Sequence, residues 1–399
     1  MRIFQLNTYC GVKSTGRIAA EIAKLVAADG GEARIGYGVP GISEDSRPFA
    51  VRVGSPIERK LHAVMRKLID AEGYGSWFAT KALIREMKNF QPDLVHFHNL
   101  HGCYLHLPLL FRYLSAADLP VVWTLHDCWP FTGHCAYHDF SGCTRWMSEC
   151  HHCPSQKNYP VCIGLDGSRR NHRMKKKTFA SLSKLTFAAP CEWMGDQLRL
   201  SFLGQYPVRT IPNGVNLHVF KPVENDLRSI HHLNDKKICL SVASEWDARK
   251  GLDYLCKAAA RLKDHCFVVI GLTSEQIAKL PDGMIGIQST SDVHELAAWY
   301  STADCLVNPT LEDNMPMVNL EALACGTPVV VFETGGCPEA VNASCGIVVS
   351  KGDLDGLCAA VQKAASGVFS RDDCIRRASM FDCEQTFQAY LSLYKELCQ

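Results

Sequence analysis

Short apolar runs alternate with amphipathic stretches along the whole chain. Runs that are almost continuously apolar are typical of strands buried on both faces, and the stretches between them have the period of helices. The first half contains RIFQLN, ARIGYGV, LVHFHN, VVWTLHD and LTFAAP, and the second half contains KICLSVA, CFVVIG, GIQST, DCLVNP and PVVVF. Two such series predict two α/β domains, each a doubly wound, Rossmann-like parallel sheet flanked by helices.

The pattern is interrupted between the two series, in the segment GQYPVRTIPNGVN at residues 204–216. Two prolines and an Asn-Gly pair mark a break there. We therefore expect a first domain over residues 1–205 and a second domain over residues 206–383. Ligands of open α/β sheets bind at the carboxyl ends of the strands, so we expect the site in a cleft that the two sheets face.

The composition is that of a globular protein with two cores. Of the 399 residues, 47% are hydrophobic and 21% are charged. No apolar run approaches the roughly 18 residues that a membrane-spanning helix needs, and MRIFQLNTYCG is polar by its fifth residue, so we expect a cytoplasmic protein. Up to Gln205 there are 25 Lys and Arg against 17 Asp and Glu, a net charge of +8, whereas the remainder has 17 against 24, or −7. The two halves should therefore face different partners.

The segment LEDNMPMVNLEALACGTPVVV, residues 311–331, places carboxylates around an apolar helix. Pro316 suits the first helical turn and Gly326 its end, so the start of this helix is predicted to bind an anion such as a diphosphate. Asp313 and Glu321 are eight residues apart, about 12 Å along a helix, which is comparable with the span from a sugar to a ribose across a diphosphate. Asp313 would accept hydrogen bonds from the sugar and Glu321 from the ribose diol. By spacing alone, a negative charge near a helix start and a half-buried helix residue explain the two carboxylates equally well.

Several segments resemble the retaining glycosyltransferases of family 4, which have the GT-B fold. Asp313 and Glu321 match the family's pattern of an acid, seven residues and a Glu, although the first acid is usually Glu. IPNGVN resembles the family's interdomain segment, ARKGLDYL its diphosphate-binding segment and AWYSTADCLVNPT its approach to the acids. FQAYLSLYKELC resembles the last helix, about residues 384–399, which in GT-B proteins crosses back onto the first domain.

The resemblance implies a retaining glycosyltransferase that moves a sugar from a UDP- or GDP-linked donor to a saccharide acceptor. The acceptor is expected to be lipid-linked, and the pathway to be cell-surface polysaccharide biosynthesis. The first domain would bind the acceptor and the second the donor. Because the leaving diphosphate would be stabilised by cationic side chains and by a helix N-terminus, no catalytic metal is expected.

The resemblance also assigns residues of the second domain. Lys250 corresponds to the residue that clamps the diphosphate, and Arg249 is the candidate for a second cation because Glu245 stands where many relatives have Arg. A solvated helix start remains the alternative for Arg249 and Lys250. The expected catalytic residues are Asp313, Lys250 and His126, and the expected donor-binding residues are Glu321, Arg249, Glu312, Asn314, Met315, Pro316 and Met317.

Candidate acceptor-side residues follow the first strands of the chain. GVKSTGRIAAEIA has glycines at positions 11 and 16, and it lacks the Lys and Ser/Thr of a P-loop. Gly11 and Gly16 let a backbone loop approach a phosphate or an acceptor, unless they form only an ordinary turn. His98 and His126 each follow a predicted strand, where core histidines also occur. The resemblance favours His126 for contact with the transferred sugar or the acceptor, with His98 second.

A cysteine-rich insert at residues 128–162 contains the spacing C-x7-C-x6-C-x2-C. The last pair has the spacing of zinc ligands, which predicts one structural zinc, and unligated core thiols are the alternative. The insert resembles that of a family subgroup assigned to exopolysaccharide and colanic-acid-type synthesis. The predicted ligands are Cys135, Cys143, Cys150 and Cys153, with His134, His138, His151 and His152 as substitutes.

Charge and motif content bear on the remaining partners and on two rival functions. The basic run RRNHRMKKK, residues 169–177, predicts a solvated helix face. The alternative is a surface that attracts anionic lipid headgroups at the inner face of the cell membrane or a lipid-linked phosphate acceptor. One rival is an NAD-dependent oxidoreductase, but the chain lacks a dinucleotide-binding fingerprint. The other is a zinc-containing nucleic-acid-binding protein. The near-neutral charge argues against it, and we expect no nucleic-acid partner.

Overall fold

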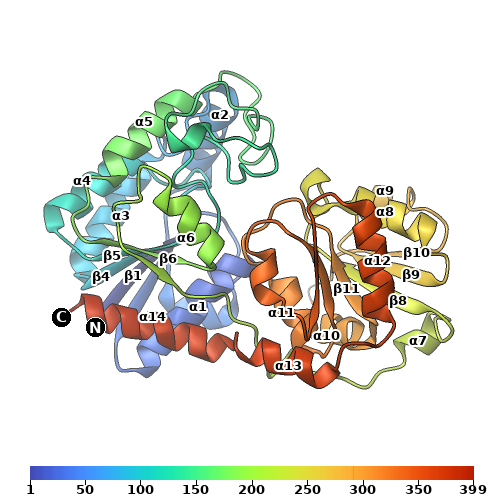
Figure 1. Ribbon diagram of the computed structural model, residues 1–399. Coiled ribbons are helices and arrows are strands. Elements are labelled where there is room, and N and C mark those ends of the chain that lie inside the picture. The colour runs from blue at the N-terminus through green and yellow to red at the C-terminus, as the bar shows by residue number, and fades with distance from the viewer. Residues whose placement is uncertain (291) are drawn as a thin grey trace. The chain divides into compact units, whose positions relative to one another are not determined.

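The computed structural model describes residues 1–290 and 292–399. The chain forms two compact units: unit 1 contains Met1–Ile211 and Phe387–Gln399, and unit 2 contains Pro212–Thr386. Each unit has one parallel sheet with helices on both of its faces (Figure 1), which confirms the two doubly wound α/β folds predicted from the sequence. Among the described residues, no helix is both long and apolar enough to cross a bilayer.

The sheet of unit 1 has seven strands in the order β3-β2-β1-β4-β5-β6-β7. Its strands are β1 (Arg2–Asn7), β2 (Glu32–Tyr37), β3 (Ala50–Arg52), β4 (Leu94–Phe97), β5 (Val121–Thr124), β6 (Leu185–Ala189) and β7 (Val208–Thr210). Its helices are α1 (Lys13–Ala28), α2 (Pro56–Ile69), α3 (Trp77–Phe90), α4 (Leu107–Ala117), α5 (Ser168–Phe179) and α6 (Glu192–Arg199), with the 3-10 helices η1 (Glu44–Phe49) and η2 (Arg145–Met147). The strand order reverses between β1 and β4, and in open α/β sheets a crevice forms at such a point, outside the carboxyl ends of the strands.

The last residues of the chain complete the core of unit 1. Helix α14 (Cys383–Leu397) places Tyr390 and Tyr394 in one cluster with residues of α1 and the central strands. Tyr394 Oη lies 2.5 Å from His96 Nδ1, and Thr124 Oγ1 donates to Tyr390 Oη at 3.0 Å. The opposite face of the sheet carries aromatic rings whose centroids lie 4.6 to 6.1 Å apart, those of Phe97, Phe111, Trp123 and Phe179.

The sheet of unit 2 has six strands in the order β10-β9-β8-β11-β12-β13. Its strands are β8 (Lys237–Val242), β9 (His265–Ile270), β10 (Met284–Ile287), β11 (Cys305–Asn308), β12 (Val329–Phe332) and β13 (Gly346–Val349). Its helices are α7 (Leu227–Ile230), α8 (Leu252–Arg261), α9 (Ser274–Ile277), α10 (Val293–Thr302), α11 (Met317–Ala324), α12 (Leu354–Ala365) and α13 (Arg371–Ser379), with η3 (Ala248–Lys250) and η4 (Cys337–Ala340). Here the order reverses between β8 and β11, and the loops after these strands meet at one edge of the sheet.

Candidate functional site

An ion pair forms where the loops after β8 and β11 meet. Lys250 ends η3 after β8, and Asp313 lies in the loop after β11. Lys250 Nζ lies 2.5 Å from Asp313 Oδ2, and the two side chains are 20% and 18% exposed. Burial alone would raise the pKa of the Asp313 carboxyl, but the charge and hydrogen bond of Lys250, together with the charge of Arg249, lower it below its ordinary value. The structure thus brings two of the predicted catalytic residues together as a charged pair.

Arg249 connects the same two loops by hydrogen bonds to backbone atoms. Its Nη1 donates to Glu312 O at 2.7 Å, and Leu311 N donates to Arg249 O at 2.7 Å. The Arg249 side chain is 14% exposed and its Nε lies 3.7 Å from Asp247 Oδ2. Glu312 is fully buried, whereas Glu245 is exposed. Arg249 and Glu312 therefore help to hold the loop that carries Asp313.

Helix α11 begins directly after this loop, as the sequence predicts. Its residues are Met317–Ala324, Pro316 is its N-cap residue, and Gly326 follows the helix with a φ of +82°. Asn314 and Met315, which precede the helix, are buried. The first backbone N–H groups of a helix have no partners within it, and the helix dipole adds positive potential there. The start of α11 therefore lies four residues after Asp313 in the chain and offers backbone N–H groups that can bind an anion.

Glu321 lies on α11 and has a different partner from Asp313. Tyr300 Oη, from the buried end of α10, donates to Glu321 Oε2 at 2.8 Å. Burial, and next the charge of Glu321, raise the pKa of Tyr300 well above its ordinary value, so its hydroxyl remains a donor. The two predicted carboxylates are thus held separately, one by a lysine and the other by a tyrosine.

Two glycines pack against Asp313 that were not predicted from the sequence. Gly336 N donates to Asp313 O at 3.3 Å. Gly335 has a φ of +54°, and a Cβ at this position would lie 1.7 Å from Asp313 O. Glycine is therefore required here both for its conformation and for space. The glycine pair begins three residues after the end of the buried strand β12, which was the available signal.

A pocket of about 620 Å³ lies at the carboxyl ends of β8, β9 and β10. Its lining includes Trp246, Thr273 and Gln276, which the sequence analysis also missed. Trp246 Nε1 donates to Ile270 O at 2.9 Å, and Gln276 Nε2 donates to Trp246 O at 2.8 Å, so the pocket wall is fixed. A larger pocket of about 900 Å³ includes Asp304, at the amino end of β11. Ligands of open α/β sheets bind at the carboxyl ends of the strands, so the pocket of about 620 Å³ is the favoured ligand site.

In unit 1 the two predicted histidines lie side by side after β4 and β5. His98 Nδ1 is 3.0 Å from His126 Nε2, and His98 Nε2 is 2.9 Å from Gln5 Oε1. Because Gln5 Nε2 donates to Ala19 O, Gln5 Oε1 accepts from His98, and His98 Nδ1 then accepts from His126 Nε2–H. Burial, and then neighbouring ring charges, lower the pKa of His98, and burial lowers that of His126 to about 4. Both rings are therefore neutral near pH 7, and Nδ1 is the acceptor atom of His126.

Gly11 lies in the loop between β1 and α1, and Gly16 lies in the first turn of α1. Gly11 has a φ of +69°, and a Cβ there would lie 2.0 Å from Ser43 Oγ. Gly11 N donates to Gly16 O at 2.9 Å, and Gly16 is buried against Tyr9. Both glycines thus have packing roles, and a role in acceptor binding stays a prediction.

The four predicted zinc ligands lie on the loop between β5 and α5. The Cys135 and Cys153 thiols form a hydrogen bond, which lowers the pKa of Cys153 to about 7. Gly133 N donates to Cys150 Sγ at 3.2 Å. Within residues 1–290 and 292–399, no three of the four sulfurs lie within 4.8 Å of one another. Next to Cys135, His134 Nδ1 lies 2.6 Å from Asp70 Oδ1, and its buried Nε2 has no hydrogen-bond partner.

We expect about one structural zinc per chain on this loop. The donors fit zinc because thiolates and a neutral imidazole are its usual ligands, and a carboxylate behind the histidine is a usual outer partner. His134 is therefore a candidate to replace one of the four thiols. Elemental analysis of protein purified without chelator should find the zinc in the wild type and in a Cys256→Ser control, and lose it in Cys150→Ser and Cys153→Ser. A metal-free wild type would contradict this expectation.

The basic run at residues 169–177 is less solvated than the sequence predicts. It forms α5, on which Lys175 is buried, with its Nζ 3.4 Å from the centroid of the Trp129 ring. Burial lowers the pKa of Lys175 to about 7. Arg169 and Arg173 both pair with Glu149. Lys175 thus belongs to the core beside the cysteine-rich loop, and only part of the run faces solvent.

Comparisons with known proteins agree with this arrangement. The profile of a family described as Glycosyltransferase Family 4 matches residues 16–219, and that of Glycosyl transferases group 1 matches residues 236–366. The putative colanic acid biosynthesis glycosyl transferase WcaC of Escherichia coli K12 is 23% identical over 418 aligned residues, which cover 100% of both chains.

Sucrose-phosphate synthase from Thermosynechococcus elongatus has a TM-score of 0.70 at 17% identity, over 99% of this chain and 98% of that one. Anabaena HepE in complex with UDP has a TM-score of 0.67 at 15% identity, over 99% and 100% of the chains. These structural likenesses confirm the GT-B fold.

Proposed function

Because the chain belongs to glycosyltransferase family 4, we propose that it transfers a sugar from a nucleotide diphosphate donor to a saccharide acceptor that is lipid-linked. The transfer retains the anomeric configuration and serves cell-surface polysaccharide biosynthesis. The full-length similarity to a putative colanic acid biosynthesis glycosyl transferase supports this pathway class. The UDP and UDP-glucose complexes of Anabaena HepE support a UDP-linked donor over a GDP-linked one. Family membership also favours glycosyl transfer over the oxidoreductase and nucleic-acid-binding alternatives.

The Lys250 and Asp313 pair is the observation that carries the proposal. In the reaction, the bond between the sugar C1 and the diphosphate oxygen breaks, and its electron pair stays on the departing diphosphate. The acceptor hydroxyl forms the new bond to C1, and its proton leaves with the phosphate oxygen. A fixed ammonium group beside the start of a helix stabilises the charge that develops on the leaving group.

The same pair gives both side chains a role once the donor binds. Lys250 then contacts the diphosphate as a second anionic partner, and the Asp313 carboxylate accepts hydrogen bonds from the sugar hydroxyls. The Gly335 and Gly336 backbone packs against Asp313 and fixes the loop that carries its carboxylate. No catalytic metal is needed in this scheme, because the protein's own cation and helix N-terminus face the diphosphate.

The remaining parts of the donor are assigned to residues of unit 2. Tyr300 orients the Glu321 carboxylate, which accepts hydrogen bonds from the ribose diol. The pocket beside Trp246 and Gln276 has the size and the fixed wall for a nucleobase. In unit 1 the neutral His126, oriented through His98, contacts the transferred sugar or the acceptor hydroxyl.

We expect Glu321→Ala to weaken donor binding by about 1.5 to 3 kcal/mol, because the ribose diol loses a charged hydrogen-bond acceptor. The donor is first identified by screening UDP- and GDP-sugars for a ligand-induced rise in melting temperature. Titration of that donor then compares Glu321→Ala with the wild type and with Glu295→Ala, which removes an exposed carboxylate of α10.

Unchanged donor affinity in folded Glu321→Ala would refute the role of Glu321. A screen in which no nucleotide sugar raises the melting temperature would count against the proposed function itself. NMR of the first-formed product tests retention separately, because inversion would exclude the retaining mechanism and leave the donor and the transfer in place.

A further inference from the structure

Helix α2 exposes a continuous apolar face. His62 is its one buried residue. Residues spaced by three and four positions lie on one face of a helix, and the apolar residues of α2 have this spacing. Six of them are 38% to 72% exposed: Ile57, Leu61, Val64, Met65, Leu68 and Ile69.

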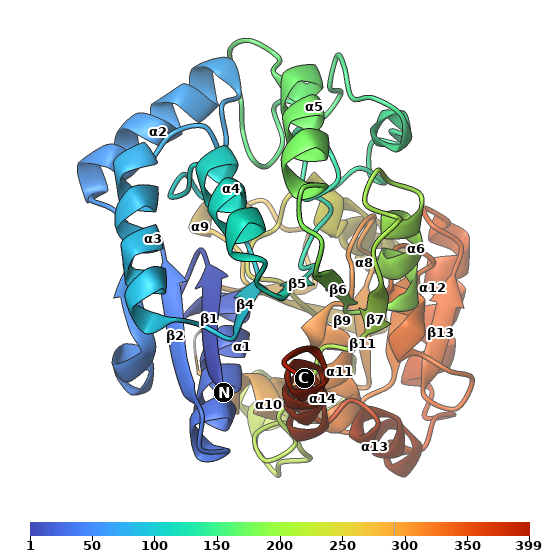
Figure 2. The same ribbon diagram turned by 90° about the vertical axis from the view of Figure 1, so that its left-hand side faces the viewer.

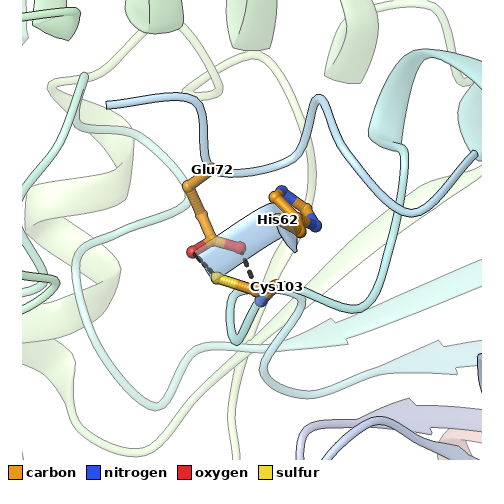
Figure 3. A group of neighbouring side chains, drawn as sticks. All are labelled: His62, Glu72 and Cys103. Carbon is orange, nitrogen blue, oxygen red and sulfur yellow. Dashed lines mark hydrogen bonds between the residues drawn. The ribbon is translucent and has the colours of Figure 1, made fainter. Parts of the chain in front are cut away.

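The buried side of α2 is attached through His62. His62 Nε2 lies 3.2 Å from the backbone N of Gly73 and of Gly75, and Nδ1 lies 2.9 Å from Ser76 Oγ. Figure 3 shows the His62 ring beside Glu72 and Cys103, whose ligand atoms lie within 4.8 Å of those of His62.

This cluster has the composition of a metal site, but its atoms are already engaged. Glu72 Oε1 accepts from Gly102 N at 3.2 Å and from Cys103 N at 2.9 Å, and Cys103 Sγ donates to Glu72 Oε2 at 3.3 Å. Backbone N–H groups also point at His62 Nε2, where a metal would need the lone pair. The cluster therefore fixes α2 to unit 1 and leaves the apolar face outward.

Two other segments with exposed apolar side chains lie at the two ends of α2, whose place in the fold is shown in Figure 2. At its start, Phe78 N donates to Glu58 Oε1 at 3.1 Å, which places the exposed Trp77 and Phe78 beside the first turn. At its end, the backbone N–H groups of Ile163 and Leu165 donate to the carbonyl oxygens of Lys67 and Leu68, at 2.9 and 2.8 Å. The α2 surface thus consists of the six helix residues with Trp77, Phe78, Ile163 and Leu165.

Basic residues predominate around the α2 surface, and the acids there, Glu58 and Asp166, accept hydrogen bonds from backbone N–H groups. Glu58 is the single acid in the sequence of α2, and its Oε1 is engaged by two backbone N–H groups of α3. Lys81 Nζ lies 3.7 Å from the centroid of the exposed Trp77 ring. The helix itself contributes the exposed Lys60 and Lys67, whereas its Arg59 and Arg66 are half-buried. An amphipathic helix with apolar residues on one face and Lys and Arg beside them is typical of segments that lie in the interface of an anionic bilayer.

We propose that the α2 surface docks on an anionic lipid bilayer, with the apolar residues of α2 inserted at the level of the headgroups. A monomeric soluble protein rarely exposes a contiguous apolar patch of this extent. Stable attachment to a membrane needs two contributions. The α2 surface supplies both, because its apolar side chains can insert and its basic side chains attract anionic headgroups. Helix α5 supplies only charge attraction, because its two apolar residues, Met174 and Phe179, are half-buried and buried, and its Lys175 is in the core. The biological role of docking rests on the proposed function, in which the acceptor is lipid-linked. Binding of the α2 surface to a bilayer does not depend on that function.

The test is sedimentation of the full chain with vesicles of phosphatidylcholine, with and without phosphatidylglycerol. We expect the wild type to sediment with the anionic vesicles, and Leu61→Gln/Val64→Gln/Leu68→Gln to lose at least about tenfold in affinity. Lys60→Gln/Lys67→Gln should lose most of the dependence on phosphatidylglycerol. The exposed side chains of Ile230 and Met380 in unit 2 provide matched apolar controls, as Ile230→Gln/Met380→Gln, and Lys176→Gln/Lys177→Gln on α5 is the basic control.

Because all substituted side chains are exposed, the variants should keep the melting temperature of the wild type and its shift with donor. Loss of vesicle binding with an intact donor shift therefore separates this proposal from the proposed function. Wild type that stays in the supernatant, or a triple variant that binds like the wild type, would overturn it. So would a wild-type dimer in size-exclusion chromatography that the triple variant abolishes without any vesicle binding, since a second copy would then cover the surface.

Discussion

Lys250→Ala is expected to lower turnover by about 10²- to 10³-fold, because it removes a fixed positive charge from the leaving diphosphate. The substitution also leaves Asp313 without its partner, which destabilises a largely buried carboxylate. Comparison with Lys250→Ala/Asp313→Asn separates the two effects, since the double variant has neither charge. We expect it to recover stability and not turnover, as measured by melting temperature and by initial rates at saturating donor.

Lys257→Ala is the matched control, because Lys257 forms an exposed ion pair with Asp253 on α8. Its turnover should remain that of the wild type. If Lys250→Ala loses melting temperature while its activity per folded molecule stays normal, Lys250 is a structural residue and its role in the reaction is wrong.

Gly335→Ala is expected to abolish most activity, because the new methyl group would overlap Asp313 O at 1.7 Å. The neighbouring atom is backbone, so the loop that holds Asp313 must shift, which changes the position of Asp313 relative to Lys250. The expected result is a loss of at least about tenfold in turnover, together with a lower melting temperature, since overpacking typically costs about 1 to 3 kcal/mol.

Gly283→Ala separates this overlap from simple backbone strain. Gly283 also has a positive φ, +87°, but a Cβ there meets nothing within 4 Å. It should therefore show only the cost of a left-handed alanine, about 1 to 2 kcal/mol, with normal turnover. Equal effects of the two substitutions on turnover would contradict the predicted displacement of Asp313.

The central strands of both sheets could be predicted from the sequence, whereas the edge strands β3 and β7 could not. All ten apolar runs correspond to strands, although GIQST begins two residues after the start of β10 (Met284–Ile287). The three strands that were missed, β3, β7 and β13, all lie at the edges of their sheets. An edge strand is covered on fewer sides, so β3 (AVR) and β7 (VRT) form no apolar run, whereas β13 (GIVV) is apolar and its signal was present in the sequence.

The candidate site could be predicted where it depends on local spacing and resemblance. Lys250, Asp313 and the start of α11 were selected in this way, and the structure brings them together. The partner of Glu321 could not be predicted, because Tyr300 lies 21 positions away on another helix. Lys175 was wrongly expected to face solvent, since nothing in a basic run indicates that one of its lysines packs over a tryptophan.

The position of α14 in the core of unit 1 has a consequence for the synthesis of the protein. Met1–Ile211 leaves the ribosome first, but its core lacks Tyr390 and Tyr394 until all of unit 2 has been translated. At roughly 5 to 20 residues per second, this interval lasts on the order of ten to forty seconds. Unit 2, whose residues are contiguous, is therefore the first to have its complete sequence available. The nascent unit 1 meanwhile exposes an apolar sheet face, and this is the stage at which a chaperone would be needed.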